Sequence, residues 1–123
     1  IEPYGITKVS TTDGRVLYEH RPSGGQQLLQ PYVAAAMPDL LQTAVNIGTG
    51  RAAQIGRPVA GKTGTAEDST GGPDHAWFAC FAPYPNGQIV VVAFAQNTPG
   101  GGSVHALPMA RKVLEVWTQL RKS

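Results

Sequence analysis

The sequence has one cysteine, few charged residues and no long apolar run. With Cys80 as the single cysteine among 123 residues, a framework of internal disulfides is excluded. Because Cys80 lies in an apolar run, we expect it to be a small buried hydrophobe and not a reactive thiol. No apolar run approaches the roughly 18 residues that span a bilayer, and the N-terminus has no charged-then-apolar signal pattern. The chain starts at Ile1 instead of Met, so we expect that some preceding sequence is missing from it.

Charge and histidine patterning exclude several classes of function. Charged residues make up 15% of the chain, which is low for a globular protein and suggests that other polypeptide covers part of its surface. The ten Lys and Arg are spread along the sequence without a cluster, so we expect no nucleic-acid partner. His20, His75 and His105 have no cysteine or carboxylate at metal-ligand spacing, and we therefore expect no metal and no other cofactor. The length suits one domain.

The first part of the chain predicts a hairpin and then a helix. Two short β-rich runs, at residues 6–11 and 15–19, flank a turn at Asp13 and Gly14. After a loop at residues 21–27, apolar residues at helical spacing predict a helix over residues 33–45. Pro38 should break that helix and start a fresh one at its first turn.

The rest of the chain predicts three strands and a second helix. The candidate strands lie at residues 58–66, 75–83 and 88–96, and Asn86-Gly87 predicts a tight turn that makes the last two antiparallel neighbours. The helix over residues 104–120 has an apolar stripe made of Leu107, Ala110, Val113, Leu114 and Trp117. The expected fold class is α+β, with an antiparallel sheet of about three main strands plus the small N-terminal hairpin, packed with helices. The strand at residues 89–94 is too apolar for a free edge, so it should need another strand beside it.

The stretch AGKTGTAE, residues 60–67, has the clearest chemical potential. In an extended strand Lys62 and Gly64 share one face, and the two threonines share the other. The missing side chain at Gly64 permits close approach, and Lys62 adds a positive charge. The hydroxyl and N–H of Thr65 can address an anion, as carboxylate binding and oxyanion stabilisation require. The alternative is a plain edge strand, with a solvated lysine and with Thr63 and Thr65 in favoured β positions.

The surroundings of this stretch closely resemble the C-terminal part of the transpeptidase domain of penicillin-binding proteins. The resemblance rests on GRPVAGKTGTAE, DHAWFACFAPYPNGQIVVVAF and ALPMARKVLE, and NIGTGRAAQI looks like the helix end that precedes the strand. It is most specific over residues 48–115. It implies a partial serine β-lactamase/transpeptidase-like fold, with hairpin and loop at residues 1–27 and the K-T-G sheet with its helices at 28–123.

The resemblance also implies an activity and a location. The family cross-links peptidoglycan through a serine acyl-enzyme, and it binds D-Ala-D-Ala stem peptides and β-lactams. Such a protein would lie in the cell envelope, at the extracytoplasmic face of the bacterial inner membrane, with its anchor outside this chain. Monofunctional and bifunctional family members both remain open.

Roles for the K-T-G residues follow from the same resemblance. Lys62 would join the electrostatic and proton network at the catalytic serine. Thr63, Gly64 and Thr65 would bind the substrate, with the two threonines holding its carboxylate. The Thr65 N–H would be one oxyanion donor.

The family's other two motifs, S-x-x-K and S-x-N, are not in the sequence. None of the five serines is followed by lysine three residues later or by asparagine two residues later. We therefore expect this chain to lack the nucleophile, to be inactive alone and to require the remainder of the transpeptidase domain. Two alternatives stay open: a non-catalytic module that senses β-lactams or binds protein or peptide, and a β-lactamase fragment. A thin core would also favour a homodimer through exposed strand edges.

Four further features have plain structural interpretations. The sequence YPN at residues 84–86 mimics a variant of S-x-N, but its Asn-Gly favours a turn. His75 follows Asp74, and a structural or rim role is favoured over that of a general base. Glu67 and Asp68 are expected to be loop charges. The glycines at residues 100–102 lack the lysine and spacing of a phosphate loop, which favours a connector.

Overall fold

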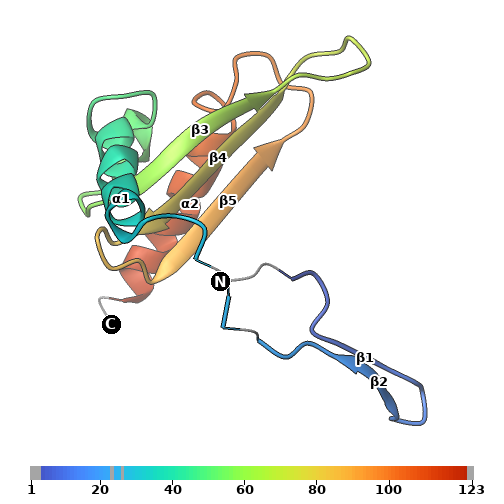
Figure 1. Ribbon diagram of the computed structural model, residues 1–123. Coiled ribbons are helices and arrows are strands. Elements are labelled where there is room, and N and C mark those ends of the chain that lie inside the picture. The colour runs from blue at the N-terminus through green and yellow to red at the C-terminus, as the bar shows by residue number, and fades with distance from the viewer. Residues whose placement is uncertain (1–3, 23, 26, 122–123) are drawn as a thin grey trace. The chain divides into compact units, whose positions relative to one another are not determined.

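A computed structural model describes residues 4–22, 24–25 and 27–121 (Figure 1). The chain divides into two units, Ile1–Pro31 and Tyr32–Ser123. The elements in chain order are β1 (Lys8–Ser10), β2 (Val16–Glu19), α1 (Pro31–Asn46), a 3-10 turn (Arg51–Ala53), β3 (Ala60–Ala66), β4 (His75–Ala82), β5 (Ile89–Ala95) and α2 (Ala106–Leu120). The expected α+β class is confirmed.

The first unit is the predicted hairpin. β1 pairs antiparallel with β2, and Lys8 lies opposite Glu19 with Nζ and Oε1 3.7 Å apart. The turn closes where Asp13-Gly14 predicted it, because Gly14 has a φ of +89° that suits glycine. All residues of both strands are exposed, so within this unit the hairpin has no buried face.

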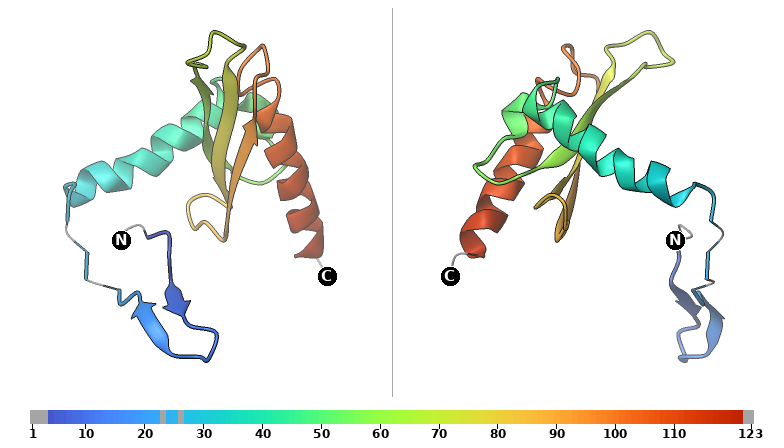
Figure 2. Two further views of the ribbon diagram at one scale, coloured as in Figure 1. Left: turned by 90° about the vertical axis from the view of Figure 1, so that its right-hand side faces the viewer. Right: turned by 60° about the vertical axis from the view of Figure 1, so that its left-hand side comes forward.

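The helix α1 runs without interruption through Pro38 (Figure 2). The expectation of a fresh helix at Pro38 was therefore wrong. A proline removes one backbone donor, but its fixed φ is close to the helical value, so the hydrogen bonds of the neighbouring turns can hold the helix together. α1 does end at the predicted place, where the Gly50 N–H donates to the Ala44 carbonyl at 3.0 Å.

The second unit is built on an antiparallel sheet with strand order β3-β4-β5. In its register Gly64 pairs with Trp77, and Trp77 pairs with Phe94. β4 and β5 are antiparallel neighbours, as expected, but the tight turn expected at Asn86-Gly87 was wrong, because Ala82 pairs with Ile89 and a loop at residues 83–88 joins the two strands. The prolines at positions 83 and 85 explain this, since neither has the N–H that a continuing ladder needs.

The core lies between one face of this sheet and α2, which crosses it (Figures 1 and 2). Its buried members include Ala76, Phe78, Cys80 and Ala93 from the sheet and Leu107, Ala110 and Leu114 from α2. Trp117 is partly buried against this cluster, as the apolar stripe predicted. Val113 was predicted wrongly, because it is 49% exposed and falls at the border of the stripe.

The opposite face of the sheet is apolar, and of the described helices only α1 lies against part of it, where Leu41 and Val90 line one cavity. Trp77, Val90, Val92 and Phe94 project from it and are all 40% or more exposed. In the part of the chain that the structure describes, no strand pairs with the outer edge of β5. No helix in that part is long and apolar enough to cross a membrane.

Candidate functional site

The K-T-G sequence lies on β3, a strand paired only with β4 among the described strands. Its start is buried: Ala60 contributes to the core, and a Cβ on Gly61 would lie 2.6 Å from the Cβ of Cys80. Glycine at position 61 therefore lets β3 approach β4 closely. Further along, Lys62 and Thr65 are exposed, while Thr63 and Gly64 are half-buried. The strand is thus anchored at its start and accessible at the K-T-G residues.

Lys62 is held beside its own strand. Its Nζ donates to the Thr63 carbonyl at 2.6 Å. Lys62 also lines a cavity of about 200 Å³ between α1 and the sheet, together with Leu41, Ala79, Phe81 and other residues. The lysine therefore places a positive charge at the border of an apolar hollow.

Thr63 is tied to the segment that follows α1. Its hydroxyl oxygen lies 2.8 Å from the hydroxyl oxygen of Thr49. Thr49 follows directly after the helix end, where Gly48 and Gly50 allow a tight turn: a Cβ on Gly48 would lie 2.8 Å from the Ala44 carbonyl oxygen. Thr49 had no predicted role, although it lies in NIGTGRAAQI, the stretch that resembles the helix end preceding the strand.

Gly64 and Thr65 complete the motif. A Cβ on Gly64 would lie 3.3 Å from the Cβ of Trp77, its cross-strand partner. Peptide groups two residues apart point to the same side of a strand. The Thr65 N–H therefore points to the side of the Thr63 carbonyl, where Lys62 also reaches. The free edge of β3 thus combines the Lys62 ammonium with the Thr65 N–H, while the hydroxyls of Thr63 and Thr65 lie on the face of the strand opposite to the Lys62 side chain.

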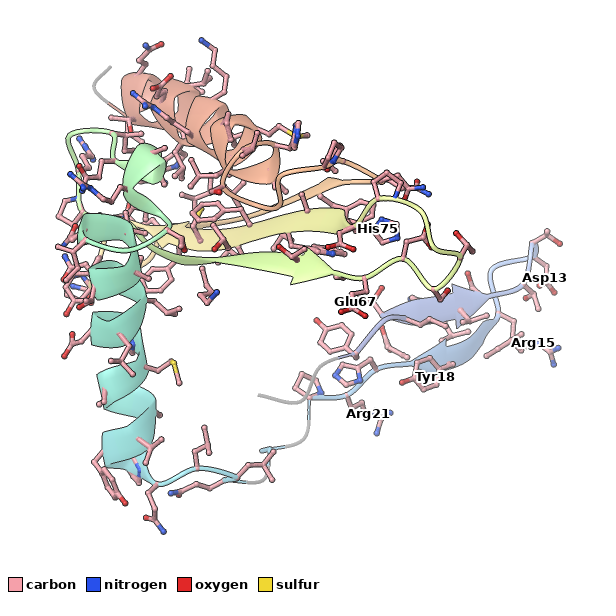
Figure 3. All side chains as sticks on the ribbon, turned by 90° about the horizontal axis from the view of Figure 1, so that it is seen from above. Asp13, Arg15, Tyr18, Arg21, Glu67 and His75 are labelled. Carbon is pink, nitrogen blue, oxygen red and sulfur yellow. The ribbon has the colours of Figure 1, made fainter. Side chains whose placement is uncertain are left out.

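The loop between β3 and β4 begins beyond this edge. Glu67 leaves the end of β3 and His75 begins β4 (Figure 3). Asp68 accepts hydrogen bonds from the Thr70 N–H at 3.0 Å and the Thr70 hydroxyl at 2.7 Å, and these bonds lower the pKa of the Asp68 carboxyl. The charge of Asp68 is therefore engaged within its own loop.

His75 connects this loop to the end of β5. Its Nδ1 accepts the Asn97 N–H at 3.1 Å, and its ring meets the Phe94 ring edge-on, with centroids 5.6 Å apart. These contacts support a structural role for His75 at the rim of the sheet. Across the described residues, no three histidine, cysteine or acidic side chains gather as a metal site.

Two other side chains singled out in the sequence lie outside the motif. Cys80 is buried, as expected, and burial raises the pKa of its thiol to about 11. Tyr84, the first residue of YPN, lies in the loop between β4 and β5. Its hydroxyl bonds Asp39, which raises the pKa of Tyr84, and its N–H donates to the Pro58 carbonyl at 2.9 Å.

The family model described as "Penicillin binding protein transpeptidase domain" matches residues 2–115. Among curated proteins, the peptidoglycan D,D-transpeptidase MrdA of Haemophilus influenzae is 41% identical over 90 residues, which are 60% of this chain and 14% of that protein. The peptidoglycan D,D-transpeptidase PbpA of Mycobacterium tuberculosis is 32% identical over 122 residues, which are 93% of this chain and 23% of that protein.

Solved structures agree with these matches. The penicillin G acyl-enzyme complex of penicillin-binding protein A from M. tuberculosis superposes with a TM-score of 0.65 and 29% identity, over 95% of this chain and 27% of that one. The D,D-transpeptidase domain of a peptidoglycan glycosyltransferase from Eggerthella lenta gives a TM-score of 0.61 and 31% identity, over 92% of this chain and 27% of that one.

The chain thus spans about a quarter or less of each of these proteins. The match to the family model covers both units and includes all of β3, β4 and β5. The chain belongs to the penicillin-binding protein transpeptidase domain family, and it corresponds to a segment of that domain.

Proposed function

We propose that this chain supplies one wall of the active site of a serine D,D-transpeptidase that cross-links peptidoglycan stem peptides and is acylated by β-lactams. The observation that carries the proposal is the free edge of β3, where the Lys62 ammonium reaches the Thr63 carbonyl and the Thr65 N–H points to the same side. The Thr63 and Thr65 hydroxyls lie on the face of the strand opposite to the Lys62 side chain. A carboxylate and a developing oxyanion are the groups that such donors stabilise.

The residues of this edge have separable roles in the proposal. Lys62 is exposed and anchored through one hydrogen bond, so its ammonium can turn from the Thr63 carbonyl toward an incoming serine. The hydroxyls of Thr63 and Thr65 bind the carboxylate of a stem peptide or β-lactam. The Thr65 N–H stabilises the tetrahedral intermediate, and Gly64 leaves room for the ligand to approach the strand.

The nucleophile would come from the remainder of the domain. The sequence contains neither S-x-x-K nor S-x-N. The exposed apolar side chains of Trp77, Val90, Val92 and Phe94 support a covering partner, since apolar surface of this kind is stabilised by removal from water. We assign this partner as the remainder of the same domain and not a second copy of the chain. The whole protein would then lie in the cell envelope, at the extracytoplasmic face of the bacterial inner membrane.

Fluorescent penicillin tests the proposal in the full-length protein that carries this segment. Wild-type protein should form a stoichiometric covalent adduct, seen as a mass shift, whereas the 123-residue chain should form none. Lys62→Ala should slow acylation by on the order of 100-fold or more, because a preorganised electrostatic group is lost. Lys112→Ala is the matched control, since Lys112 is an exposed lysine of α2. A covalent adduct on the isolated chain would contradict the claim that this chain lacks the nucleophile. A full-length protein that is not labelled would contradict the proposed enzymatic activity.

A second candidate is a module that binds peptide along β3 without chemistry. The edge of β3 that pairs with no strand among the described residues supports it, because main-chain groups of such an edge can add a peptide strand. Reversible binding of a D-Ala-D-Ala peptide by the full-length protein without any penicillin adduct would favour this candidate. Sedimentation of the isolated chain checks the assignment of the covering partner. A tight dimer that persists when the remainder of the domain is added would contradict that assignment.

A further inference from the structure

The loop between β5 and α2 packs against the K-T-G strand. It contains the three glycines at residues 100–102 and lies beside the ends of β3 and β4 (Figure 1). A Cβ on Gly102 would lie 2.1 Å from the Trp77 carbonyl oxygen, and 2.9 and 3.1 Å from the O and N atoms of Gly64. Real Cβ contacts do not occur below about 3.0 Å, and backbone atoms cannot rotate away as a side chain can. Glycine at position 102 therefore allows the loop to rest on the Gly64–Trp77 pair.

Gly101 borders the next residue of the motif. A Cβ on Gly101 would lie 2.9 Å from the hydroxyl oxygen of Thr65. The φ of Gly101 is +72°, in the left-handed region that favours glycine. Consecutive glycines thus contact consecutive residues of the K-T-G strand, the first at a hydroxyl and the second at the backbone.

The loop has its own fixed support. The Gly102 carbonyl accepts the Leu107 N–H at 2.9 Å, in the first turn of α2, and the Leu107 side chain is fully buried. The Gly101 carbonyl accepts the Val104 N–H at 3.3 Å. At the start of the loop, Nε2 of His105 lies 2.7 Å from the Pro99 carbonyl oxygen. Gly101 and Gly102 are therefore each held by a hydrogen bond to the residues that lead into or begin α2.

We propose that Gly101 and Gly102 are positioning residues that set where Gly64 and Thr65 lie. The proposal rests on the proposed function and goes beyond it, because it assigns to the loop after β5 the placement of the oxyanion donor and the carboxylate-binding hydroxyl. A methyl group at position 102 must push the strand or the loop by a sizeable fraction of an ångström. Misplacing reacting groups by about 1 Å costs on the order of 100-fold in rate.

The kinetic test uses Gly102→Ala in the full-length protein. The expected result is acylation by penicillin slowed on the order of 100-fold, at a temperature where circular dichroism shows a folded protein. Gly87→Ala is the matched control, because its Cβ would also be crowded, 2.9 Å from a Phe81 ring carbon, but in the loop between β4 and β5. Leu114→Ala lowers stability through the α2 core without touching β3, and it should keep the rate of the wild type. Equal rate losses in Gly102→Ala and Leu114→Ala at equal stability would overturn the proposal.

Amide hydrogen exchange gives a readout that does not depend on penicillin. Exchange in the segment at residues 61–67 should accelerate in Gly102→Ala but not in Leu114→Ala of matched stability. If the wild-type protein is not acylated, the proposed function fails while the exchange result still decides the positioning role. If Gly102→Ala does not fold, Gly101→Ala replaces it, with a displaced Thr65 hydroxyl and weakened penicillin binding as the expected result. Unchanged exchange and unchanged acylation in a folded glycine variant would overturn the proposal.

Discussion

The hydroxyl oxygens of Thr49 and Thr63 lie 2.8 Å apart and share a hydrogen bond between the turn after α1 and the centre of the K-T-G strand. The two residues are 14 positions apart in sequence. The bond links the helix end to a side chain that we propose binds a carboxylate. Because Thr63 is engaged on one side by Thr49, its hydroxyl is oriented before a ligand arrives.

A double-mutant cycle on Thr49→Val and Thr63→Val should measure this link. Each valine keeps the branched shape and removes the hydroxyl. We expect a coupling of about 0.5–1 kcal/mol in the free energy of unfolding, the usual net value of a neutral hydrogen bond at an accessible position. Urea unfolding of the full-length protein measures it. Additive effects of the two substitutions would show that the hydroxyls do not stabilise each other.

Cys80 should make stability depend on alkaline pH. Burial raises the pKa of its thiol from an ordinary 9.0 to about 11, so the folded state disfavours the thiolate. The contribution of the buried Cys80 thiol to the free energy of unfolding is therefore fully present below pH 9.0 and is lost as the pH rises toward 11. The free energy of unfolding, measured from pH 9.0 to 11, should fall more steeply in the wild type than in Cys80→Ala. A thiol reagent at pH 8 should label Cys80 only after denaturation, and rapid labelling of the folded protein would contradict the buried environment.

Asp68 should respond to the loss of the Thr70 hydroxyl. The Thr70 N–H is the larger cause of its lowered pKa, and the Thr70 hydroxyl is the second. Thr70→Val removes the hydroxyl and keeps the N–H, so the pKa of Asp68 should rise but remain below 3.8. A pH titration by NMR measures this shift. Asp13, whose pKa is lowered by Thr11, serves as an internal reference and should not change.

Alanine substitutions at Leu114 and Val113 should have very different effects on the free energy of unfolding, although the two residues are neighbours in one helix. Leu114 is fully buried, so Leu114→Ala should lower the free energy of unfolding by about 2–5 kcal/mol. Val113 is 49% exposed, and Val113→Ala should change it by about 0.5 kcal/mol or less. Thermal unfolding of both variants in the full-length protein provides the comparison. Similar losses would indicate that α2 presents a different face to the sheet than the structure shows.

Much of the fold could be predicted because its patterns are local. Alternation of apolar residues predicted β4 and β5, and a helical stripe predicted α2 within two residues of its observed start. The predictions failed at prolines. Pro38 was expected to interrupt α1, and Pro83 and Pro85 were overlooked beside the strong Asn86-Gly87 signal. In both places the outcome depends on the surrounding packing and pairing, which local propensity does not describe.

The candidate site was predictable only as a set of residue types. Lys62, Thr63, Gly64 and Thr65 were identified from their spacing and from the sequence around them. The contacts of Thr49 and Gly102 were not, because Thr49 is distant from Thr63 in sequence and a Gly-rich segment before a helix is typical of an ordinary connector. Their proximity to β3 results from the packing of α1 and α2 around the sheet.

The sequence by itself determined the element types, the family and the chemical groups on β3, because these follow from side-chain periodicity and from a contiguous motif. Only the tertiary structure decided which backbone each glycine must approach and which hydroxyl is oriented by another. Those properties depend on distances of about 3 Å between segments far apart in the chain, and close packing sets such distances. Gly102 shows this difference most clearly: the sequence indicates only an ordinary connector residue, whereas the fold places Gly102 against the backbone of the K-T-G strand.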